Sequence, residues 1–508
     1  MLNKFIIIVP LYNVEKWVSK NIKSIQLQDY ENYECYLVDD MSTDNTVELA
    51  SKLISGDSRF HLTVNKEKKY ALRNICEAIE SSQSSDNDVI VTLDGDDWLA
   101  TKKALTRLNK TYNEHGCELT YGSYIEFPSM TKGKFCREIP TDVVKHRAYR
   151  QREWVSSHLR TFKSSLWKKI APEDLKNAEG EYHAMAWDMA FMFPMLEMAG
   201  PLAMHIPEIN YVYNRDNPIN DDKVNHKLQL ETEMKIRQGD SYENSFVTCE
   251  ILGPSGGLSG LGNQLFCIST ALAYGIETGR CAVFPQINPR NSLVYKFRDN
   301  FYKNLQIGRD IDIYHRTIRE KKFSFDELNV GETHENVKLS GYFQSEKYFK
   351  RHRSAILKAL GITQLQEQVR DQHGDYSGHV SIHVRRGDYL SLADFHHNLP
   401  LEYYKKAVKH FSTDEKFVVF SDDISWCRKN FSFLKNVEFS EGREDWIDLI
   451  LMSSCKSNII ANSTFSWWAA WLNTTPEKLV VCPGKWFGPK YSDKDVSDLI
   501  PDEWVVKV

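Results

Sequence analysis

Short apolar runs alternate with helical stretches over roughly the first 215 residues, which is the pattern of a mixed α/β layer. The apolar runs predict buried strands at residues 5–9, 33–38 and 88–93. After the first run, apolar residues recur on one helical face at Val14, Trp17, Val18, Ile22 and Ile25. This spacing predicts a helix over residues 14–28, and a second helix is expected over residues 44–54.

The pattern breaks between about residues 214 and 245, where the chain becomes polar and rich in turn-forming residues. An α/β pattern then resumes, with strands expected at 246–252, 380–384, 417–420, 457–460 and 479–482. A chain of 508 residues is also too long for one hydrophobic core. We therefore predict a first domain over 1–215, a linker over 216–245 and a second domain over 246–508.

Composition narrows the class of protein. Lys and Arg number 64 against 69 Asp and Glu, and the net charge of −5 argues against a general nucleic-acid binder. The longest apolar run near the start is five residues long, far short of the ~20 that span a bilayer, so no integral membrane segment is expected. No basic amphipathic helix stands out either. Ten cysteines without a CxxC pair favour reduced thiols in the cytosol.

Acidic or turn-forming residues follow each of the first three predicted strands. Pro10 follows the first strand, Asp39 and Asp40 end the second, and the acidic turn Asp94-Gly95-Asp96-Asp97 ends the third. In an open α/β sheet, ligands bind beyond the carboxyl ends of the strands, so these side chains are expected to share one crevice. Clustered carboxylates there can hold Mg²⁺ or Mn²⁺ that bridges two phosphates. A single Asp at a strand end can equally be a helix cap or a turn former.

Together these motifs resemble the inverting family 2 glycosyltransferases of GT-A fold, over roughly residues 3–215. The resemblance rests on residues 9–13, 38–46 and 93–98. It implies a nucleotide-sugar donor bound by Pro10, Tyr12, Asp39, Asp40 and Asp94, with Asp40 or else Asp39 on the nucleobase. It also implies a metal site formed by Asp94, Asp96 and Asp97.

The same family needs a base that deprotonates the acceptor hydroxyl. The resemblance places this base at Asp188, which precedes an apolar helix, although a helix cap is the alternative. His158 and Arg160 lie in a segment that also resembles the family, and a surface position would explain them equally well.

The second half carries a different set of charged groups. His383 and Arg385 share one face of the predicted strand at 380–384, whereas Arg386 points differently. One arginine could bind a diphosphate while Asp388 holds the other arginine, although a surface charge pair is the alternative. A glycine-rich stretch at 256–264 precedes a predicted helix. The helix start at 462–471 offers Ser463, Thr464 and Ser466 to a phosphate, and its tryptophans are expected to pack in the core.

These motifs, with residues 341–349 and 420–423, resemble the family 11 α-1,2-fucosyltransferases over about residues 247–508. The resemblance implies a GT-B-like fold of two Rossmann-type halves, GDP-fucose as donor, no metal, and transfer to a galactose 2-hydroxyl. Arg385 and Arg386 would hold the diphosphate as catalytic groups, and His383 with Asp422 or Asp423 would bind the guanosine. The remaining donor-binding residues implied are Asn263, Ser463, Thr464 and Ser466. Asp388 and Asp394 are both candidates for the acceptor base. The chain departs from the family in its longer opening at 256–260.

The leading interpretation is an α/β bifunctional glycosyltransferase, in which a GT-A domain precedes a GT-B-like domain. Its expected partners are nucleotide sugars including GDP-fucose and an oligosaccharide or lipid-linked glycan acceptor. We expect it to be cytoplasmic, either free or peripheral at the inner face of a membrane, and to build surface polysaccharide. Two alternatives stay open: a single α-1,2-fucosyltransferase with a non-catalytic GT-A domain that binds glycan, and a sugar-binding protein without catalysis.

Overall fold

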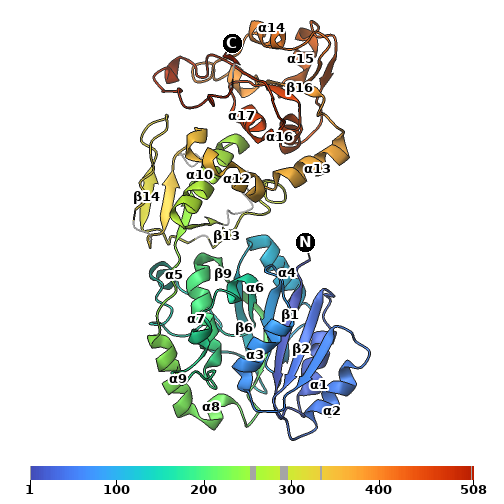
Figure 1. The fold of residues 1–508 in the computed structure, drawn as a ribbon, viewed down its shortest axis with the longest axis vertical. Helices are drawn as coiled ribbons and strands as arrows, with labels where there is room; N and C mark the ends of the chain where they lie inside the picture. The colour runs from blue at the N-terminus through green and yellow to red at the C-terminus, as the bar shows by residue number, and fades with distance from the viewer. Residues whose placement is uncertain are drawn as a thin grey trace. The chain divides into compact units, whose positions relative to one another are not determined.

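The computed structural model describes residues 2–251, 259–285, 296–309, 311–331, 334–504 and 506–507. Its contacts divide the chain into two units, which are coloured along the chain in Figure 1. Unit 1 comprises Met1–Asn244 and Gln306–Ile313, and unit 2 comprises Ser245–Leu305 and Tyr314–Val508. None of the helices in these described ranges is long and apolar enough to cross a membrane.

Unit 1 is built on a mixed sheet of nine strands in the order β3-β2-β1-β4-β8-β6-β9-β5, with β7 paired to β6. β1 runs parallel to β2 and β4, and β2 runs parallel to β3, whereas β8 is antiparallel to β4. The carboxyl ends of β1, β2 and β4 therefore meet at one edge, which confirms the crevice expected from the sequence. The strand bounds are β1 Phe5–Leu11, β2 Tyr33–Asp39, β3 Phe60–Val64, β4 Val89–Thr92, β5 Trp98–Leu99, β6 Leu119–Phe127, β7 Thr131–Lys132, β8 Arg160–Lys163 and β9 Ala203–Asn214.

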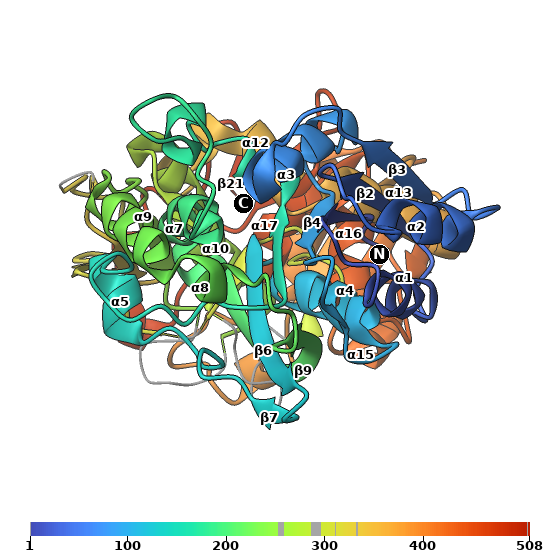
Figure 2. The ribbon, with the colours of Figure 1, turned by 90° about the horizontal axis from the view of Figure 1, so that it is seen from below.

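Helices of unit 1 bury one apolar stripe each, with one exception. In α1 the buried residues Val18, Ile22 and Ile25 recur at helical spacing. The exception is α7, which is apolar all round and almost wholly buried. Figure 2 shows α1 and α2 at one end of unit 1 and α7 and α9 at the other. The bounds are α1 Val18–Gln26, α2 Thr46–Ile54, α3 Tyr70–Ser81, α4 Ala104–His115, α5 Thr141–His146, α6 Ser164–Trp167, η1 Pro172–Leu175, α7 Trp187–Ala199, η2 Gly200–Leu202, α8 Asp221–Val224 and α9 His226–Gln238.

The segment expected to be a linker is part of unit 1. Residues 216–244 contain α8 and α9, and α9 buries Ile236. The carbonyl of Ile236 accepts a hydrogen bond from Arg150 Nη1 at 2.7 Å, and Arg150 forms a buried ion pair with Glu197 at 2.7 Å. The backbone N–H of Tyr242 donates to the same Glu197 at 2.9 Å. The polar composition of this segment therefore reflects a solvent-facing helix whose backbone is anchored, not a free connection.

A short piece of the second half of the chain completes unit 1. This piece, Gln306–Ile313, contains β13 (Ile307–Gly308) and the buried Arg309. Arg309 Nε lies 2.8 Å from Glu138 Oε1, its Nη2 donates to the Ile139 carbonyl at 3.0 Å, and its backbone N–H donates to the Pro201 carbonyl at 3.0 Å. Cleavage near residue 245 would separate these partners.

We expect Arg309→Ala in the full chain to destabilise unit 1 locally by about 2 kcal/mol, because the Ile139 carbonyl loses its buried partner. Hydrogen exchange of β6 and α5 peptides should accelerate by roughly 30-fold. Arg351→Ala removes an exposed guanidinium in unit 2 and should leave these peptides unchanged. Equal exchange in both variants would show that Arg309 does not anchor the piece.

Unit 2 contains two all-parallel sheets. The first has the order β11-β10-β15-β14 and the second has the order β18-β17-β16-β19-β20-β21. The strand bounds are β10 Phe246–Cys249, β11 Cys281–Ala282, β12 Phe284–Pro285, β14 Arg316–Arg319, β15 Val337–Ser340, β16 His379–Val384, β17 Lys416–Ser421, β18 Val437–Phe439, β19 Ser457–Ile459, β20 Val480–Cys482 and β21 Val506–Lys507. Parallel strands need crossover helices on the faces of the sheet, which explains the alternating pattern of the second half.

Aromatic side chains fill the contact between α10 and α17 of unit 2. Trp467 and Trp468 are fully buried, and the ring of Phe266 lies 4.4 Å from that of Trp467. Phe349 stacks on Trp468 at 5.4 Å. The prediction that these tryptophans pack in the core is confirmed. The bounds are α10 Leu261–Thr278, η3 Glu346–Tyr348, η4 Lys350–His352, α12 Arg353–Ala359, α13 Ile362–His373, η5 Asp388–Leu390, α14 Leu401–Ala407, η6 Val408–His410, α15 Ile424–Asn430, α16 Asp445–Ser453, α17 Thr464–Leu472 and η7 Pro489–Tyr491.

Candidate active sites

A cleft of about 230 Å³ lies at the carboxyl edge of the sheet in unit 1. Of the residues predicted from the sequence, five line it: Pro10, Tyr12, Asp40, Asp94 and Asp96. The lining also includes side chains that the sequence did not single out, namely Lys68, Tyr70, Asn74, Trp187, Tyr213, Asn217 and Asn220. The cleft is therefore formed by residues from the strand ends, from the start of α3 and the loop before it, from the start of α7, and from β9 and the segment that follows it.

The acidic turn after β4 is fixed by its backbone. Asn21 of α1 donates from Nδ2 to the carbonyls of Asp94 at 3.0 Å and Asp97 at 2.8 Å. A side chain at Gly95 would place its Cβ 2.6 Å from the Pro10 carbonyl oxygen, so only glycine fits there. The turn consequently lies directly against the end of β1.

Asp97 connects the acidic turn to β9. It is fully buried, Tyr211 donates from its hydroxyl to Oδ2 at 2.5 Å, and the Asn214 N–H donates to Oδ1 at 2.6 Å. Burial raises the pKa of Asp97 well above its usual range, and the charges of Asp96 and Asp94 add to this effect. Both oxygens of Asp97 are thus engaged by unit 1 itself, which assigns this side chain to holding the turn.

Asp96 faces the cleft. Asn217 donates from Nδ2 to Asp96 Oδ2 at 2.7 Å, and burial raises the pKa of Asp96. In the described ranges no group of three or more His, Cys, Asp or Glu side chains is close enough together to hold a metal ion. Asp94 and Asp96 nevertheless both line the cleft. Two carboxylates fit a divalent cation that takes its other oxygen ligands from a bound diphosphate.

Cation binding should be visible in the stability of the full chain. When the pKa of a carboxyl is raised in the folded protein, the free energy of unfolding falls as the pH rises above the ordinary pKa of ~3.9. The reason is that the unfolded chain then releases its proton, whereas the folded protein still binds it. Mn²⁺ at about 100 times its Kd should therefore stabilise unit 1 by about 2.7 kcal/mol at neutral pH and by much less near pH 4. Thermal unfolding with and without Mn²⁺ measures this difference.

Asp96→Asn should abolish the Mn²⁺ effect, because it removes the cleft-facing charge. Asp86→Asn is the matched control, since Asp86 is an exposed carboxylate of unit 1 paired with Lys168. An undiminished Mn²⁺ shift in the Asp96 variant would place the cation elsewhere.

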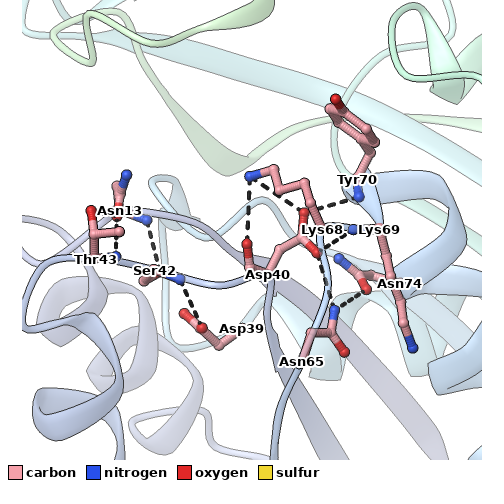
Figure 3. A network of polar contacts seen from close by, with 10 residues as sticks. All are labelled: Asn13, Asp39, Asp40, Ser42, Thr43, Asn65, Lys68, Lys69, Tyr70 and Asn74. Carbon is pink, nitrogen blue, oxygen red and sulfur yellow. Dashed lines mark hydrogen bonds and ion pairs between the residues drawn. The ribbon is translucent and has the colours of Figure 1, made fainter.

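Asp40 organises the loop before α3, as Figure 3 shows. Its Oδ1 accepts from the Lys69 N–H at 2.8 Å and from Asn65 Nδ2 at 3.1 Å. Its Oδ2 accepts from the Tyr70 N–H at 2.9 Å and lies 3.4 Å from Lys68 Nζ. Burial opposes ionisation of Asp40, but these hydrogen bonds outweigh it and lower the pKa. Four donors thus surround this carboxylate, and Asp40 lines the cleft together with Lys68, Tyr12 and Tyr70.

Asp39 is almost fully buried and does not line the cleft. Its Oδ2 accepts from the Ser42 N–H at 3.0 Å, and its Oδ1 has no hydrogen-bond partner in the described part of the chain. In Figure 3 its carboxylate lies beside the Ser42 turn, apart from the Asp40 network. Asp39 thus shapes the turn that carries Ser42.

A chain of side chains joins Asp188 to the acidic turn. Asp188 lies in the first turn of α7, and its Oδ2 is 3.4 Å from Arg160 Nη1. The same guanidinium nitrogen is 3.3 Å from His158 Nε2. His158 stacks on Tyr211 at 4.4 Å, and Tyr211 donates to Asp97.

His158 and Arg160 are buried, at 8% and 2% exposure, so the alternative of a surface position for them is wrong. Burial lowers the pKa of His158 well below its usual range, and the Arg160 charge adds to this. A neutral His158 can accept the Arg160 hydrogen bond. Asp188 itself accepts from the Met189 N–H at 3.0 Å, but the cap residue of α7 is Ala186, so helix capping does not account for the Asp188–Arg160 pair.

In unit 2 both predicted arginines are paired with carboxylates. Arg385 lies between Asp388, 2.7 Å from Nη2, and Asp422, 3.0 Å from Nη1. Arg386 Nε lies 3.2 Å from Asp423 Oδ2, and its guanidinium stacks over the Trp426 ring at 3.9 Å. The expectation of one arginine held by Asp388 fits Arg385. The second arginine is held as well, which the sequence spacing did not reveal.

His383 is buried beside this pair of arginines. Burial, with the nearby Arg385 charge, lowers the pKa of His383 to about 3. Its Nδ1 has no hydrogen-bond partner in the described part of the chain, and its ring lies 5.6 Å from that of Phe465 at the start of α17. A neutral imidazole with an unused nitrogen can accept or donate one hydrogen bond to a ligand.

The starts of α10 and α17 approach each other closely. A Cβ at Gly262 would lie 2.6 Å from Thr464 Oγ1. Asn263 accepts at Oδ1 from Gln344 at 3.0 Å, and Ser463 caps α17 by accepting from the Phe465 N–H at 3.3 Å. Ser466 is fully buried and exchanges hydrogen bonds with the backbone of Ala461, so it stabilises the loop. Residues 256–258 of the predicted glycine-rich stretch lie outside the described residues.

The two candidates for the acceptor base differ in their surroundings. Asp388 pairs with Arg385, and its side chain is 53% exposed. Asp394 pairs with Lys490 Nζ at 3.2 Å and is 68% exposed. The sequence also missed Tyr389, whose ring stacks on His396 at 4.0 Å and whose hydroxyl donates to the Asn462 carbonyl at 3.2 Å. Tyr389 thereby ties the arginine segment to the start of α17.

Two family models match the chain. Glycosyl transferase family 2 matches residues 6–170, and Glycosyl transferase family 11 matches residues 295–506. The matches do not overlap, so a family 2 segment precedes a family 11 segment, as the sequence motifs predicted.

Curated relatives agree with the two family models. "O-antigen biosynthesis glycosyltransferase WbnK" of Escherichia coli is 39% identical over 183 residues, which cover 33% of this chain and 59% of the relative. "Alpha-1,2-colitosyltransferase" of Escherichia coli is 28% identical, covering 48% of this chain and 95% of the relative. "Galactoside alpha-(1,2)-fucosyltransferase 1" of Leontopithecus chrysomelas is 32% identical, covering 27% of this chain and 43% of the relative. The chain spans less than two thirds of the first and third of these proteins.

Proposed function

We propose that this chain, in which a family 2 segment is followed by a family 11 segment, is a bifunctional glycosyltransferase. Unit 1, of GT-A type, transfers a sugar from a nucleotide donor with the help of Mg²⁺ or Mn²⁺. Unit 2, of GT-B type with two Rossmann-type halves, transfers fucose from GDP-fucose to a galactoside 2-hydroxyl without a metal. One observation carries the proposal: each unit has its own means of neutralising a diphosphate, by carboxylates with a cation in one and by guanidinium groups in the other.

In unit 1 the donor occupies the cleft between Tyr12, Lys68 and the acidic turn. A cation held by Asp94 and Asp96 would neutralise the leaving diphosphate. Asp188 accepts the proton of the acceptor hydroxyl while that oxygen forms its bond to the anomeric carbon and the nucleoside diphosphate departs. Trp187 lines the cleft, and Asp188 follows it in the chain, which supports this role. Arg160 orients Asp188 through their ion pair, and His158 and Tyr211 connect Arg160 to Asp97 of the acidic turn.

In unit 2 the donor diphosphate binds the two arginines beside their carboxylate partners. Arg385 and Arg386 already face Asp422 and Asp423, so their guanidinium groups are held in position before the donor arrives. His383 offers its free Nδ1 to the guanosine or ribose. Asn263, Ser463 and Thr464 lie where two helix starts converge and contact the phosphates. Either Asp388 or Asp394 accepts the proton of the galactose hydroxyl.

Colitose is a second candidate sugar for unit 2, because the relative matched over 95% of its length is named a colitosyltransferase. A donor screen with UDP- and GDP-sugars on the full chain, including GDP-fucose and activated colitose, tests both units at once. We expect EDTA to abolish turnover of the unit 1 donor and to leave turnover of GDP-fucose unchanged. A single metal-independent turnover would instead support the fucosyltransferase with a non-catalytic first domain, and no turnover would support a sugar-binding protein.

We further infer that the two units act in succession on one cytoplasmic glycan, which is lipid-linked or free, because fusion raises the local concentration of the intermediate. Variants of the full chain are needed to test this, because Gln306–Ile313 belongs to unit 1 and a first half expressed alone would lack it. Full chains carrying Asp188→Asn and Arg385→Ala should each stop at a defined product. If the product of unit 1 is not accepted by unit 2, succession is wrong.

A further inference from the structure

A lysine-lined hollow of about 570 Å³ lies beside α1 of unit 1 and shares no lining residue with the cleft. Lys16, Lys20 and Lys23 line it from α1 and the turn before α1, and Lys102 lines it from the loop after β5. No acidic side chain is part of the lining. We call this hollow, with its four lysines, the lysine hollow.

Helix α1 brings two of the lysines together, since Lys20 and Lys23 are three residues apart and share one face of the helix. Lys16 lies four residues before Lys20, in the turn that leads into α1. The residues at the buried face are Val18, Ile22 and Ile25. All four lysines of the hollow are exposed, and within the described ranges no ion pair joins any of them to a carboxylate. Elsewhere in unit 1, Lys4, Lys68 and Lys69 each pair with an Asp or Glu.

This arrangement is electrostatically unfavourable without a ligand. Like charges about one turn apart on a helix, such as those of Lys20 and Lys23, repel each other and destabilise the helix. Lys20 Nζ lies 3.5 Å from the Trp98 ring centre and 4.8 Å from that of Phe127, which favours its charged form, whereas partial burial lowers its pKa. An anion seated among the four ammonium groups would reduce their mutual repulsion and offset the partial desolvation of Lys20.

Apolar surface beside the hollow indicates what kind of anion fits. Leu27 lines the hollow with 69% of its surface exposed, directly after α1. A single-stranded nucleic acid would need exposed aromatic rings for base stacking, but Trp98 in this hollow is only 7% exposed. A layer of phosphates above an apolar interior matches both the four charges and the exposed leucine.

We propose that the lysine hollow docks unit 1 on an anionic membrane surface, with Lys16, Lys20, Lys23 and Lys102 on lipid phosphates and Leu27 in the apolar layer. The docking does not depend on the transferase activities proposed above. It does connect to the cleft, because Asn21 on α1 holds the carbonyls of Asp94 and Asp97, and Trp98 follows Asp97. A docked α1 would hold the acidic turn near the headgroup layer, where a lipid-linked acceptor presents its sugar.

Co-sedimentation of the full chain with vesicles tests the proposal. The vesicles contain phosphatidylcholine alone or with about one third phosphatidylglycerol, in about 0.1 M salt. We expect binding to the anionic vesicles only. Combining Lys16→Gln, Lys20→Gln and Lys23→Gln should weaken it by about 100-fold, because each surface lysine contributes about 1 kcal/mol. Adding Leu27→Ser should weaken vesicle binding further, and this additional loss should not be reproduced by raising the salt concentration.

The matched control combines Lys409→Gln, Lys416→Gln and Lys435→Gln, which removes the same charge from exposed lysines of unit 2. This variant should bind like the parent protein. Equal loss in both triple variants, or no binding of the parent protein, overturns the proposal. So does displacement of the protein from vesicles by millimolar inorganic phosphate or by a single-stranded oligonucleotide, which would assign the hollow to those ligands.

Donor hydrolysis separates this proposal from the proposed function. The α1 triple variant should hydrolyse soluble nucleotide sugars at the rate of the parent protein while losing its vesicle binding. A parent protein that binds anionic vesicles through α1 but hydrolyses no donor would overturn the proposed function and support the docking surface.

Discussion

Asp188→Asn is expected to lower sugar transfer by unit 1 by about 10²- to 10⁴-fold, the usual contribution of a positioned general base. Asparagine keeps the shape of the side chain and can still contact Arg160, but it cannot take up the proton of the acceptor hydroxyl. Donor affinity should change little, because Asp188 is not part of the lining of the cleft. Steady-state kinetics with a saturating donor, together with calorimetric titration of the nucleotide, separate the two quantities.

The network behind Asp188 provides a second test of the same role. Arg160→Gln should lower kcat with little change in the KM of the donor, because the carboxylate loses the group that orients it, and Arg160→Lys should restore part of kcat. Asp142→Asn is the matched control, since Asp142 pairs with Arg152 on the surface of unit 1. Full activity of the Asp188 variant would assign the base to another residue and leave Asp188 a structural partner of Arg160.

Arg385→Ala is expected to lower fucose transfer by unit 2 by about 10²- to 10³-fold, as loss of one preorganised donor to developing negative charge does elsewhere. The guanidinium of Arg385 is held by two carboxylates from different segments, so a diphosphate meets it already in place. The metal-dependent turnover of unit 1 should be unaffected. Parallel assays of GDP-fucose transfer and of the unit 1 donor on one preparation measure both effects.

Two controls define what Arg385 does. Arg428→Ala removes an exposed guanidinium of unit 2 that pairs with Glu441, and it should leave transfer unchanged. Asp388→Asn distinguishes the two roles open to Asp388. A change below about tenfold fits a carboxylate that only holds Arg385, whereas a loss beyond about 10²-fold fits the acceptor base and excludes Asp394. Unchanged fucose transfer in the Arg385 variant would show that this arginine does not stabilise the diphosphate.

Local sequence signals located the site of unit 1 well. Strand periodicity and the residues that follow each strand predicted that Pro10, Asp40 and Asp94 would share an edge, because parallel strands align their carboxyl ends. The separate roles of the carboxylates in the acidic turn could not be predicted from the sequence. Asp97 belongs to the same short acidic motif as Asp96, yet it is turned to Tyr211 and Asn214, which lie more than 110 positions further along the chain.

The same limit applies to groups whose function depends on distant partners. His158 and Arg160 could not be distinguished from surface residues by sequence, because their burial comes from contacts with Tyr211 and Trp187. The lysine hollow is formed by α1 and by Lys102, about 80 positions away, so no single segment shows a basic amphipathic pattern. Asn217 lay in the predicted linker, and only its hydrogen bond to Asp96 shows that it belongs to the cleft.

By itself the sequence determined that two α/β segments with separate diphosphate chemistry follow one another, because periodicity, turn residues and clustered charges are local properties of the chain. The tertiary structure alone decided which carboxylates face the cleft, which arginines are already paired, and that Gln306–Ile313 completes unit 1. These features depend on contacts between segments far apart in the chain, where burial and hydrogen-bond geometry select one partner among many of the same chemical type.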